Sequence, residues 1–387
     1  MRTLVRPVVL AAAVVLSVGS SHGTAAASPL RLTLPPPTGP NAVGTTSLHL
    51  VDRSRTDPLS TPPAPRELMI SLWYPTRDVT GHPVVPWLPT AAAARFARDN
   101  GLAPDDIRVP DTHGHDGAPV ARCGGRLPVV LYSPGNDSFR SANTVVVEEL
   151  SSRGYLVVTV DHTHDALVEF PGGRVSTPVP DGPETGTLVA EARVADVRFV
   201  LDQLAVLDQG GNPDAEGHAL PTGLRGALDL TRVGMFGYSA GAATTATTLY
   251  QDRRVRAGIS VDGPVTGPVV TAGLDRPYLL MDGRATRAGV PDLQTFWSNL
   301  RGWRRDIALT GAAHSTYGDF AVVLPQAAVL LGLTKEDVEA EIGTVAPDRA
   351  VAVQRAYPAA FFDRHLRHTG HLLDGPSPRF PEITFIP

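Results

Sequence analysis

A serine between two glycines gives the first sign of chemistry in this chain. Residues 237–241 read Gly-Tyr-Ser-Ala-Gly, with Ser239 at the centre. If the chain leaves a strand, turns sharply at Ser239 and enters a helix, the serine hydroxyl is lifted clear of the backbone. The residues two before and two after are then pressed against neighbouring backbone, where a Cβ would clash, and Gly237 and Gly241 avoid that clash. The alternative is a chance pattern among small residues.

A serine hydroxyl needs a base, because it is a poor nucleophile at its own pKa. His314 follows the apolar run 307–310, in a loop of small residues late in the chain. Enzymes whose nucleophilic serine stands at a strand–turn–helix carry their histidine base in such a late loop. Taken alone, His314 would equally suit a solvated loop histidine. A carboxylate must hold the imidazole in the right tautomer, and Asp262 and Asp282 each end an apolar run. The pattern of the residues leaves both acids open.

Two backbone N–H groups are needed to stabilise the oxyanion that forms when an ester carbonyl is attacked. One comes from Ala240, which follows the serine at the start of a predicted helix, where free N–H groups point outward. The other should come from a loop after an early central strand. Residues 131–136, Leu-Tyr-Ser-Pro-Gly-Asn, form such a loop, and Asn136 is the candidate donor.

Alternating apolar strands and amphipathic helices position these residues. Leu188, Ala192, Ala195 and Phe199 share one helical face, and the stretch 155–160 is apolar without interruption. Strands are predicted at 48–51, 68–74, 128–132, 155–160, 232–236, 255–261, 278–281 and 307–310. This pattern predicts an α/β fold with a mostly parallel sheet of about eight strands, helices on both faces and an antiparallel first pair. Ligands bind beyond the carboxyl ends of such strands.

The chain divides into four segments by composition. Residues 1–27 have a basic start, a short apolar run and a small-residue end, which predicts a cleaved export signal and a secreted protein. Residues 28–45 are expected to be an irregular lead-in, 46–369 one catalytic domain and 370–387 an irregular tail. No later stretch reaches the ~20 apolar residues of a membrane helix.

Charge and metal-ligand spacing restrict the partners. The net charge of −5 over 387 residues argues against nucleic acid. Cys123 is the only cysteine, so an internal disulfide is excluded. The clusters 113–116 and 162–165, each reading His-x-His-Asp, resemble half a metal site, but zinc needs three or four converging ligands. We expect no metal and no cofactor, and we expect the second cluster to line the cleft.

Six segments match the pattern of one enzyme family. They are SLWYPTR (71–77), LPVVLYSPGNDSFR (127–140), RVADVRFVLDQL (193–204), GMFGYSAGAATT (234–245), GISVDGP (258–264) and TGAAHSTYGDF (310–320). These segments resemble the α/β-hydrolase family of secreted platelet-activating factor acetylhydrolases and their bacterial relatives, discontinuously over about residues 46 to 325. In that family the acid follows the earlier strand, so the resemblance favours Asp262 over Asp282. Mammalian members have His-Gly where this chain has Pro134-Gly135, a change that spares the backbone donor at Asn136.

The combined expectation is a secreted serine carboxylic ester hydrolase that forms an acyl-enzyme. Ser239, Asp262 and His314 are the predicted triad. The resemblance implies calcium-independent, phospholipase A2- or acetylhydrolase-like action on short-acyl or lipid esters, with transient contact at a lipid interface. The loops 76–127 and 162–187 match too little to identify the substrate. The alternatives are a cutinase- or lipase-type hydrolase of polyesters or triglycerides, an acyltransferase, and a catalytically silent binding protein. The oligomeric state is open.

Overall fold

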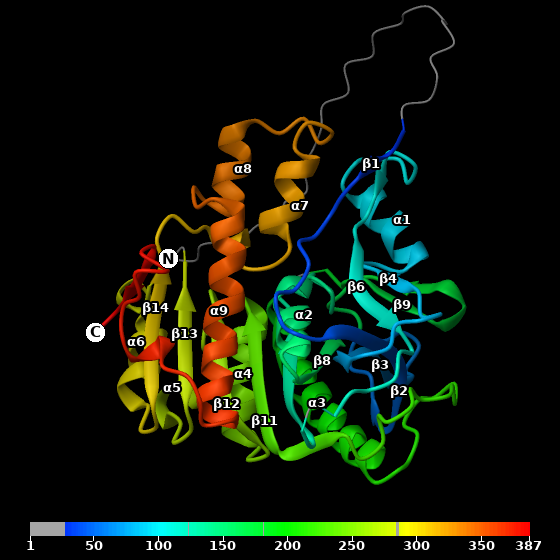
Figure 1. The fold of residues 1–387 in the computed structure, drawn as a ribbon, viewed down its shortest axis with the longest axis horizontal. Coiled ribbons are helices and arrows are strands. Elements are labelled where there is room, and N and C mark those ends of the chain that lie inside the picture. The colour runs from blue at the N-terminus through cyan, green and yellow to red at the C-terminus, as the bar shows by residue number, and fades with distance from the viewer. Residues whose placement is uncertain (1–27, 123, 181, 284–285) are drawn as a thin grey trace, which may run out of the picture.

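A mixed sheet of eleven strands forms the centre of the computed structural model, which describes residues 28–122, 124–180, 182–283 and 286–387 (Figure 1). The strands follow the order β15-β14-β13-β12-β11-β7-β8-β3-β2-β6-β4. The six strands from β14 to β8 are all parallel, whereas β3 pairs antiparallel with both β8 and β2. This arrangement confirms the predicted α/β fold with a mostly parallel sheet and an antiparallel first pair.

The strands of the sheet are β2 Ala42–Thr56, β3 Pro65–Thr76, β4 Val84–Pro86, β6 Asp111–Asp116, β7 Leu127–Ser133, β8 Leu156–Asp161, β11 Leu228–Tyr238, β12 Val255–Val261, β13 Tyr278–Asp282, β14 Arg304–Leu309 and β15 Ile383–Phe385. Two small ladders lie apart from this sheet and pair β1 Leu30–Arg31 with β5 Ile107–Arg108, and β9 Val168–Phe170 with β10 Arg174–Ser176. The helices are α1 Thr90–Asp99, α2 Thr144–Ser152, α3 Pro183–Asp208, α4 Ala240–Gln251, α5 Val269–Ala272, α6 Pro291–Asn299, α7 Phe320–Ala327, α8 Lys335–Ile342 and α9 Pro347–Leu366.

Helices cover both faces of the parallel strands because alternate strand residues feed two separate cores. On β7, Val130 and Tyr132 pack into the core shared with α2 and α9, while Val129 and Leu131 pack into the core shared with α3 and α4. In Figure 1, α9 crosses the front of the sheet. All four of these β7 side chains are almost fully buried, which explains why the strand reads as a continuous apolar run.

The sheet is wider than the apolar pattern predicted, because three further strands are either polar or too short to be recognised by that pattern. β6 has the sequence Asp-Thr-His-Gly-His-Asp, and β4 and β15, of three residues each, form the two edges. β2 begins at Ala42, so the end of the segment 28–45 belongs to the sheet. The segment 370–387 is likewise not wholly irregular, since β15 pairs antiparallel with β14. The predicted export signal, residues 1–27, lies outside the described residues.

The register of the parallel strands brings the chemically interesting loops to one edge. Gly237 on β11 is paired with Ser133 on β7, and Tyr238 is paired with Val261 on β12. The chain after β7, after β11 and after β12 therefore leaves the sheet side by side. The segment after β14 contacts α7 and α8. Within the described ranges no helix is long and apolar enough to cross a membrane.

Candidate active site

Ser239 occupies the sharp turn between β11 and α4. Its backbone has φ 54° and ψ −117°, and residues that carry a Cβ rarely adopt such a positive φ. The Ser239 N–H donates to the Val261 carbonyl at 3.0 Å, which ties the turn to the neighbouring strand. The strand, turn and helix thus hold the serine at the carboxyl edge of the sheet.

The two glycines that flank Ser239 permit close contact between backbones. A Cβ at position 237 would overlap the carbonyl oxygen of Gly241. A Cβ at position 241 would overlap the carbonyl oxygen of Ser133, at the end of β7. The spacing of the motif therefore has the steric origin that the sequence suggested, and it seats the helix α4 directly on the loop that follows β7.

His314 lies within hydrogen-bonding distance of Ser239. The imidazole Nε2 is 3.1 Å from the Ser239 Oγ, and the Nδ1 is 2.6 Å from the Asp262 Oδ2. The Tyr238 hydroxyl donates to the backbone carbonyl of His314 at 3.1 Å, and the two rings lie 4.9 Å apart between centroids. The His314 side chain is 29% exposed, so this end of the chain of hydrogen bonds is open to solvent.

The two candidate acids occupy different positions. Asp262 has φ 42°, its side chain faces His314, and its Oδ1 accepts a hydrogen bond from the Gly283 N–H at 2.8 Å. Asp282 is buried, and burial, together with the charges of Asp306 and Asp262, raises the pKa of its carboxyl to about 8. Asp282 is therefore largely uncharged at neutral pH. The geometry brings Asp262, and not Asp282, to the imidazole.

The candidate oxyanion donors flank Ser239. Ala240 is the first residue of α4, and Asn136 is exposed at the far end of the loop 133–136, which we call the oxyanion loop. A Cβ at Gly135 would lie 3.3 Å from the Ser239 Cβ, so this loop runs beside the serine. Acyl transfer needs a nucleophile, a base, an orienting acid and two N–H donors, and Ser239, His314, Asp262, Ala240 and Asn136 are the candidates for these roles.

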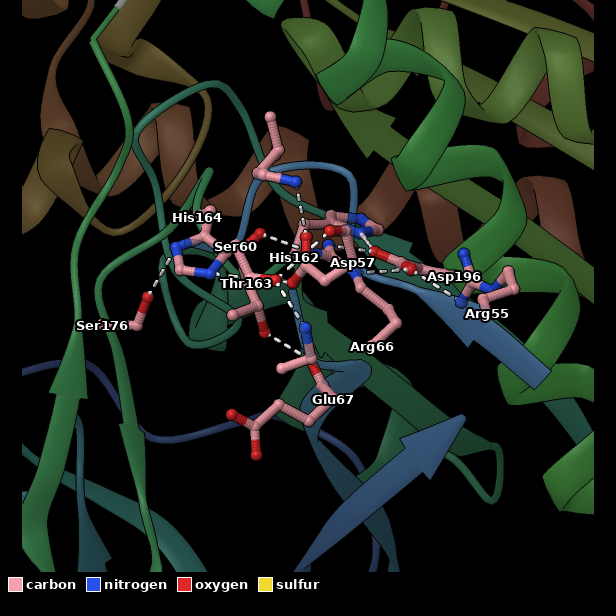
Figure 2. Close-up of polar contacts among 12 residues, drawn as sticks. Arg55, Asp57, Ser60, Arg66, Glu67, His162, Thr163, His164, Ser176 and Asp196 are labelled. Atoms are coloured by element: carbon pink, nitrogen blue, oxygen red, sulfur yellow. Dashed lines mark hydrogen bonds and ion pairs between the residues drawn. The ribbon is translucent and has the colours of Figure 1, made fainter. Parts of the chain in front are cut away.

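A second chain of serine, histidine and aspartate lies beneath the oxyanion loop and was missed from the sequence. The His162 Nε2 is 2.9 Å from the Ser133 Oγ, and its Nδ1 is 3.0 Å from the Asp196 Oδ2. Asp196 in turn accepts from the Arg66 guanidinium, at 2.7 Å for the shorter bond (Figure 2). None of these four side chains is more than 1% exposed. Burial lowers the pKa of His162 to about 4, so the ring is neutral at neutral pH.

This buried network corrects the expectation that the cluster 162–165 lines the cleft. His162 is fully buried, and His164 is directed toward Asp57 and Ser176 (Figure 2). Asp165 pairs with Arg193 of α3. In the part of the chain that the structure describes, no group of three or more histidine, cysteine, aspartate or glutamate residues is arranged to hold a metal ion.

Comparisons with known proteins point to esterases. The family model described as "Platelet-activating factor acetylhydrolase, isoform II" matches residues 190–369. A "Probable 1-alkyl-2-acetylglycerophosphocholine esterase" of Arthroderma benhamiae is 28% identical over 95% of this chain and 97% of its own length. The platelet-activating factor acetylhydrolase of Cavia porcellus is 24% identical over 74% of this chain and 69% of its own length.

A solved structure is also similar over nearly the whole chain. The ferulic acid esterase from Streptomyces cinnamoneus is 36% identical, with a TM-score of 0.77, and the match covers 93% of this chain and 100% of that chain. Both the sequence relatives and this structure are esterases or acetylhydrolases by name.

Proposed function

Because the chain belongs to the platelet-activating factor acetylhydrolase family of α/β-hydrolases and is a carboxylic ester hydrolase, we propose that it acts through a serine acyl-enzyme. Ser239 attacks the ester carbonyl while His314 takes the hydroxyl proton. Asp262 holds the Nδ1 proton of the imidazole and stabilises the imidazolium. The observation that supports this proposal best is the continuous chain from Asp262 to His314 to Ser239, with steps of 2.6 Å and 3.1 Å.

The remaining steps follow from the same groups. The former carbonyl oxygen, now negatively charged, accepts hydrogen bonds from the Ala240 and Asn136 N–H groups. His314 returns its proton to the leaving alkoxide, which departs as the alcohol and leaves the acyl group on Ser239. His314 then takes a proton from water, the hydroxide attacks the acyl carbonyl, and the acid is released as the serine regains its proton. The proposed reaction uses no metal ion, and therefore no calcium.

Short-acyl and lipid esters are the proposed substrates, since the relatives named for platelet-activating factor and for 1-alkyl-2-acetylglycerophosphocholine cover most of this chain. A second candidate is an ester of ferulic acid, which is favoured by the 36% identity to a ferulic acid esterase over that entire chain. We propose that residues 1–27 direct export, so that either substrate is met outside the cell.

The test uses pure protein with p-nitrophenyl acetate and butyrate. The Ser239→Ala variant should lose about 10⁴-fold or more in kcat, because the nucleophile is absent. Ser315→Ala, which removes a neighbouring hydroxyl 3.4 Å from Glu341, is the matched control and should stay active. Turnover by Ser239→Ala at the wild-type rate would refute the assignment. A fluorophosphonate probe should label the wild type and not Ser239→Ala; an unlabelled wild type would indicate a silent binding protein.

A substrate panel separates the candidate ester classes. It contains p-nitrophenyl esters of increasing acyl length, a 2-acetyl choline phospholipid, methyl ferulate and a polyester film, each with and without a calcium chelator. The highest kcat/KM on the acetyl phospholipid, unchanged by the chelator, is the expected result. A preference for methyl ferulate would select the second candidate, and erosion of the film would select a cutinase-type enzyme.

A further inference from the structure

A buried arginine donates hydrogen bonds to the backbone of the oxyanion loop. Arg193 of α3 donates from Nη1 to the Pro134 carbonyl at 2.7 Å and from Nη2 to the Gly135 carbonyl at 2.8 Å. The arginine residue is only 2% exposed, and its charge is balanced by the buried carboxylate of Asp165. One guanidinium therefore donates hydrogen bonds to two consecutive peptide carbonyls of the loop that carries the candidate oxyanion donor Asn136.

The direction of the Asn136 N–H follows from the hydrogen bond between Arg193 and the Gly135 carbonyl. In a trans peptide the C=O of one residue and the N–H of the next point in opposite directions. Because Arg193 draws the Gly135 carbonyl toward α3, the N–H of Asn136 is turned away from α3. A Cβ at Gly135 would lie 3.3 Å from the Ser239 Cβ, so the peptide that carries this N–H lies beside the serine.

The neighbouring contacts keep the arginine from moving. The Ser133 Oγ lies 3.4 Å from Arg193 Nη1 and is itself fixed by His162. The Asp165 carboxyl, which pairs with Arg193, also accepts a hydrogen bond from the Asp137 backbone. The Arg193–Asp165 pair thus contacts the loop at Ser133 and the chain directly after it at Asp137.

We propose that Arg193 is a positioning residue for ester hydrolysis: it orients the Asn136 N–H for the oxyanion and strengthens it as a donor. A carbonyl that accepts a hydrogen bond from a cation polarises its peptide, so the N–H of that peptide donates more strongly. The rigid fork of a guanidinium reaches both carbonyls, whereas a lysine ammonium is a point charge on a flexible stem. This inference rests on the proposed function, because it assigns a role within that reaction.

The experiment compares Arg193→Lys and Arg193→Gln with the wild type. Since the removal of one oxyanion donor typically costs about 10²–10³ in kcat, we expect Arg193→Lys to lose about 10- to 100-fold and Arg193→Gln somewhat more, with KM within about threefold. The matched control is Arg198→Lys on the same helix, whose side chain is 51% exposed and faces Asp252 rather than the loop. This control should retain the wild-type kcat.

A thionoester of the same acid and alcohol supplies a readout that a purely structural role would not change. Sulfur is a weaker hydrogen-bond acceptor than oxygen, so an intact oxyanion hole favours the ester over the thionoester. Disorientation of the Asn136 N–H should reduce that ratio by about tenfold in Arg193→Lys, while fluorophosphonate labelling of Ser239 continues. A variant that loses activity equally on ester and thionoester would overturn the proposal.

The outcomes separate this inference from the proposed function. If the wild type hydrolyses no ester, or if Ser239→Ala stays active, the proposed function fails. If the wild type is active and Arg193→Lys keeps the wild-type kcat and ester preference, only the role of Arg193 is wrong. Asp165→Asn, which removes the counterion and leaves the arginine, serves as a further variant and should also lower the ester preference. If all three variants fail to fold, Arg193 is a stabilising residue and the proposal is likewise overturned.

Discussion

This fold contains two hydrogen-bonded chains of serine, histidine and aspartate, and only one of them is open to solvent. The outer triad consists of Ser239, His314 and Asp262. The buried triad consists of Ser133, His162 and Asp196. Their hydrogen-bond distances are alike: 3.1 Å and 2.6 Å in the first, 2.9 Å and 3.0 Å in the second. Hydrogen bonding alone would not distinguish them.

Access and backbone conformation make the difference. The His314 side chain is 29% exposed, whereas every member of the buried triad is at most 1% exposed. Ser239 stands at a turn with positive φ, next to a helix N-terminus, while Ser133 is the last residue of a regular strand. The buried triad also ends in a cation, since Asp196 pairs with Arg66. A triad is therefore recognised by what surrounds it, and the buried one supports the loop above it.

The largest contrast is expected between the two histidines. His314→Gln removes the proposed base and should lower kcat by about 10⁴-fold without a large change in stability. His162→Gln should keep kcat within about tenfold and lose about 1–3 kcal/mol in the free energy of unfolding, because it disturbs a buried hydrogen-bonded chain. Ester kinetics and urea unfolding on both variants measure this. A reversal of the two effects would exchange the roles of the triads.

The acid end of the outer triad is tested next. Asp262→Asn should lower kcat by about 10³–10⁴-fold, because the amide favours the wrong imidazole tautomer. Asp282→Asn should stay within about threefold of the wild type, since a carboxyl whose pKa is raised to about 8 is already largely neutral at pH 7. Parallel assays at pH 7 compare them. Inactivation by the second substitution alone would identify Asp282 as the acid.

The pH dependence of stability should reveal the buried histidine. The pKa of His162 is lowered to about 4 in the folded chain, against ~6.5 for an unfolded one. Between these values the unfolded chain binds more protons, so the free energy of unfolding falls as the pH drops, by up to about 1.4 kcal/mol per pH unit. His162→Gln should show a shallower fall between pH 6.5 and 4 in urea titrations. Equal slopes in both proteins would mean that His162 does not resist protonation.

The smallest effect is expected at the serine of the buried triad. Ser133→Ala should leave fluorophosphonate labelling intact and reduce kcat by less than about tenfold, because Arg193 still holds the loop carbonyls. It should cost about 1–3 kcal/mol of stability, since the His162 Nε2 is left buried without a partner. Thermal or chemical unfolding beside the labelling assay measures both quantities. Loss of labelling in this variant would assign Ser133 a direct part in the reaction.

The outer triad could be proposed from the sequence because its signals are local. The spacing of glycines around Ser239 follows from contacts within one turn, and the apolar strands mark where His314 and the two acids stand. The choice between Asp262 and Asp282 depends on which of two adjacent strand ends the imidazole reaches, so it needed the family resemblance. The triad itself stays a prediction until the variants are measured.

The supporting residues could not be found in this way. Arg193 and Asp196 occupy a helix whose periodicity marks it as amphipathic, and nothing in that pattern says that two charges face inward. His162 stands beside another histidine and an aspartate, which suggested a cleft lining. Its partners Ser133 and Asp196 lie 29 and 34 residues away, and only the fold brings them together. The polar strand β6, between β2 and β4, could not be predicted for a similar reason, since it has no apolar alternation.

The left-handed turn at position 239 has a consequence for attempts to improve this protein. A glycine would adopt φ 54° with less strain than serine does, so Ser239→Gly should relax the backbone at the cost of all turnover. Laboratory selection for heat resistance alone would thus reward inactive descendants. Any search for a hardier catalyst from this scaffold has to screen survivors for ester cleavage at every round.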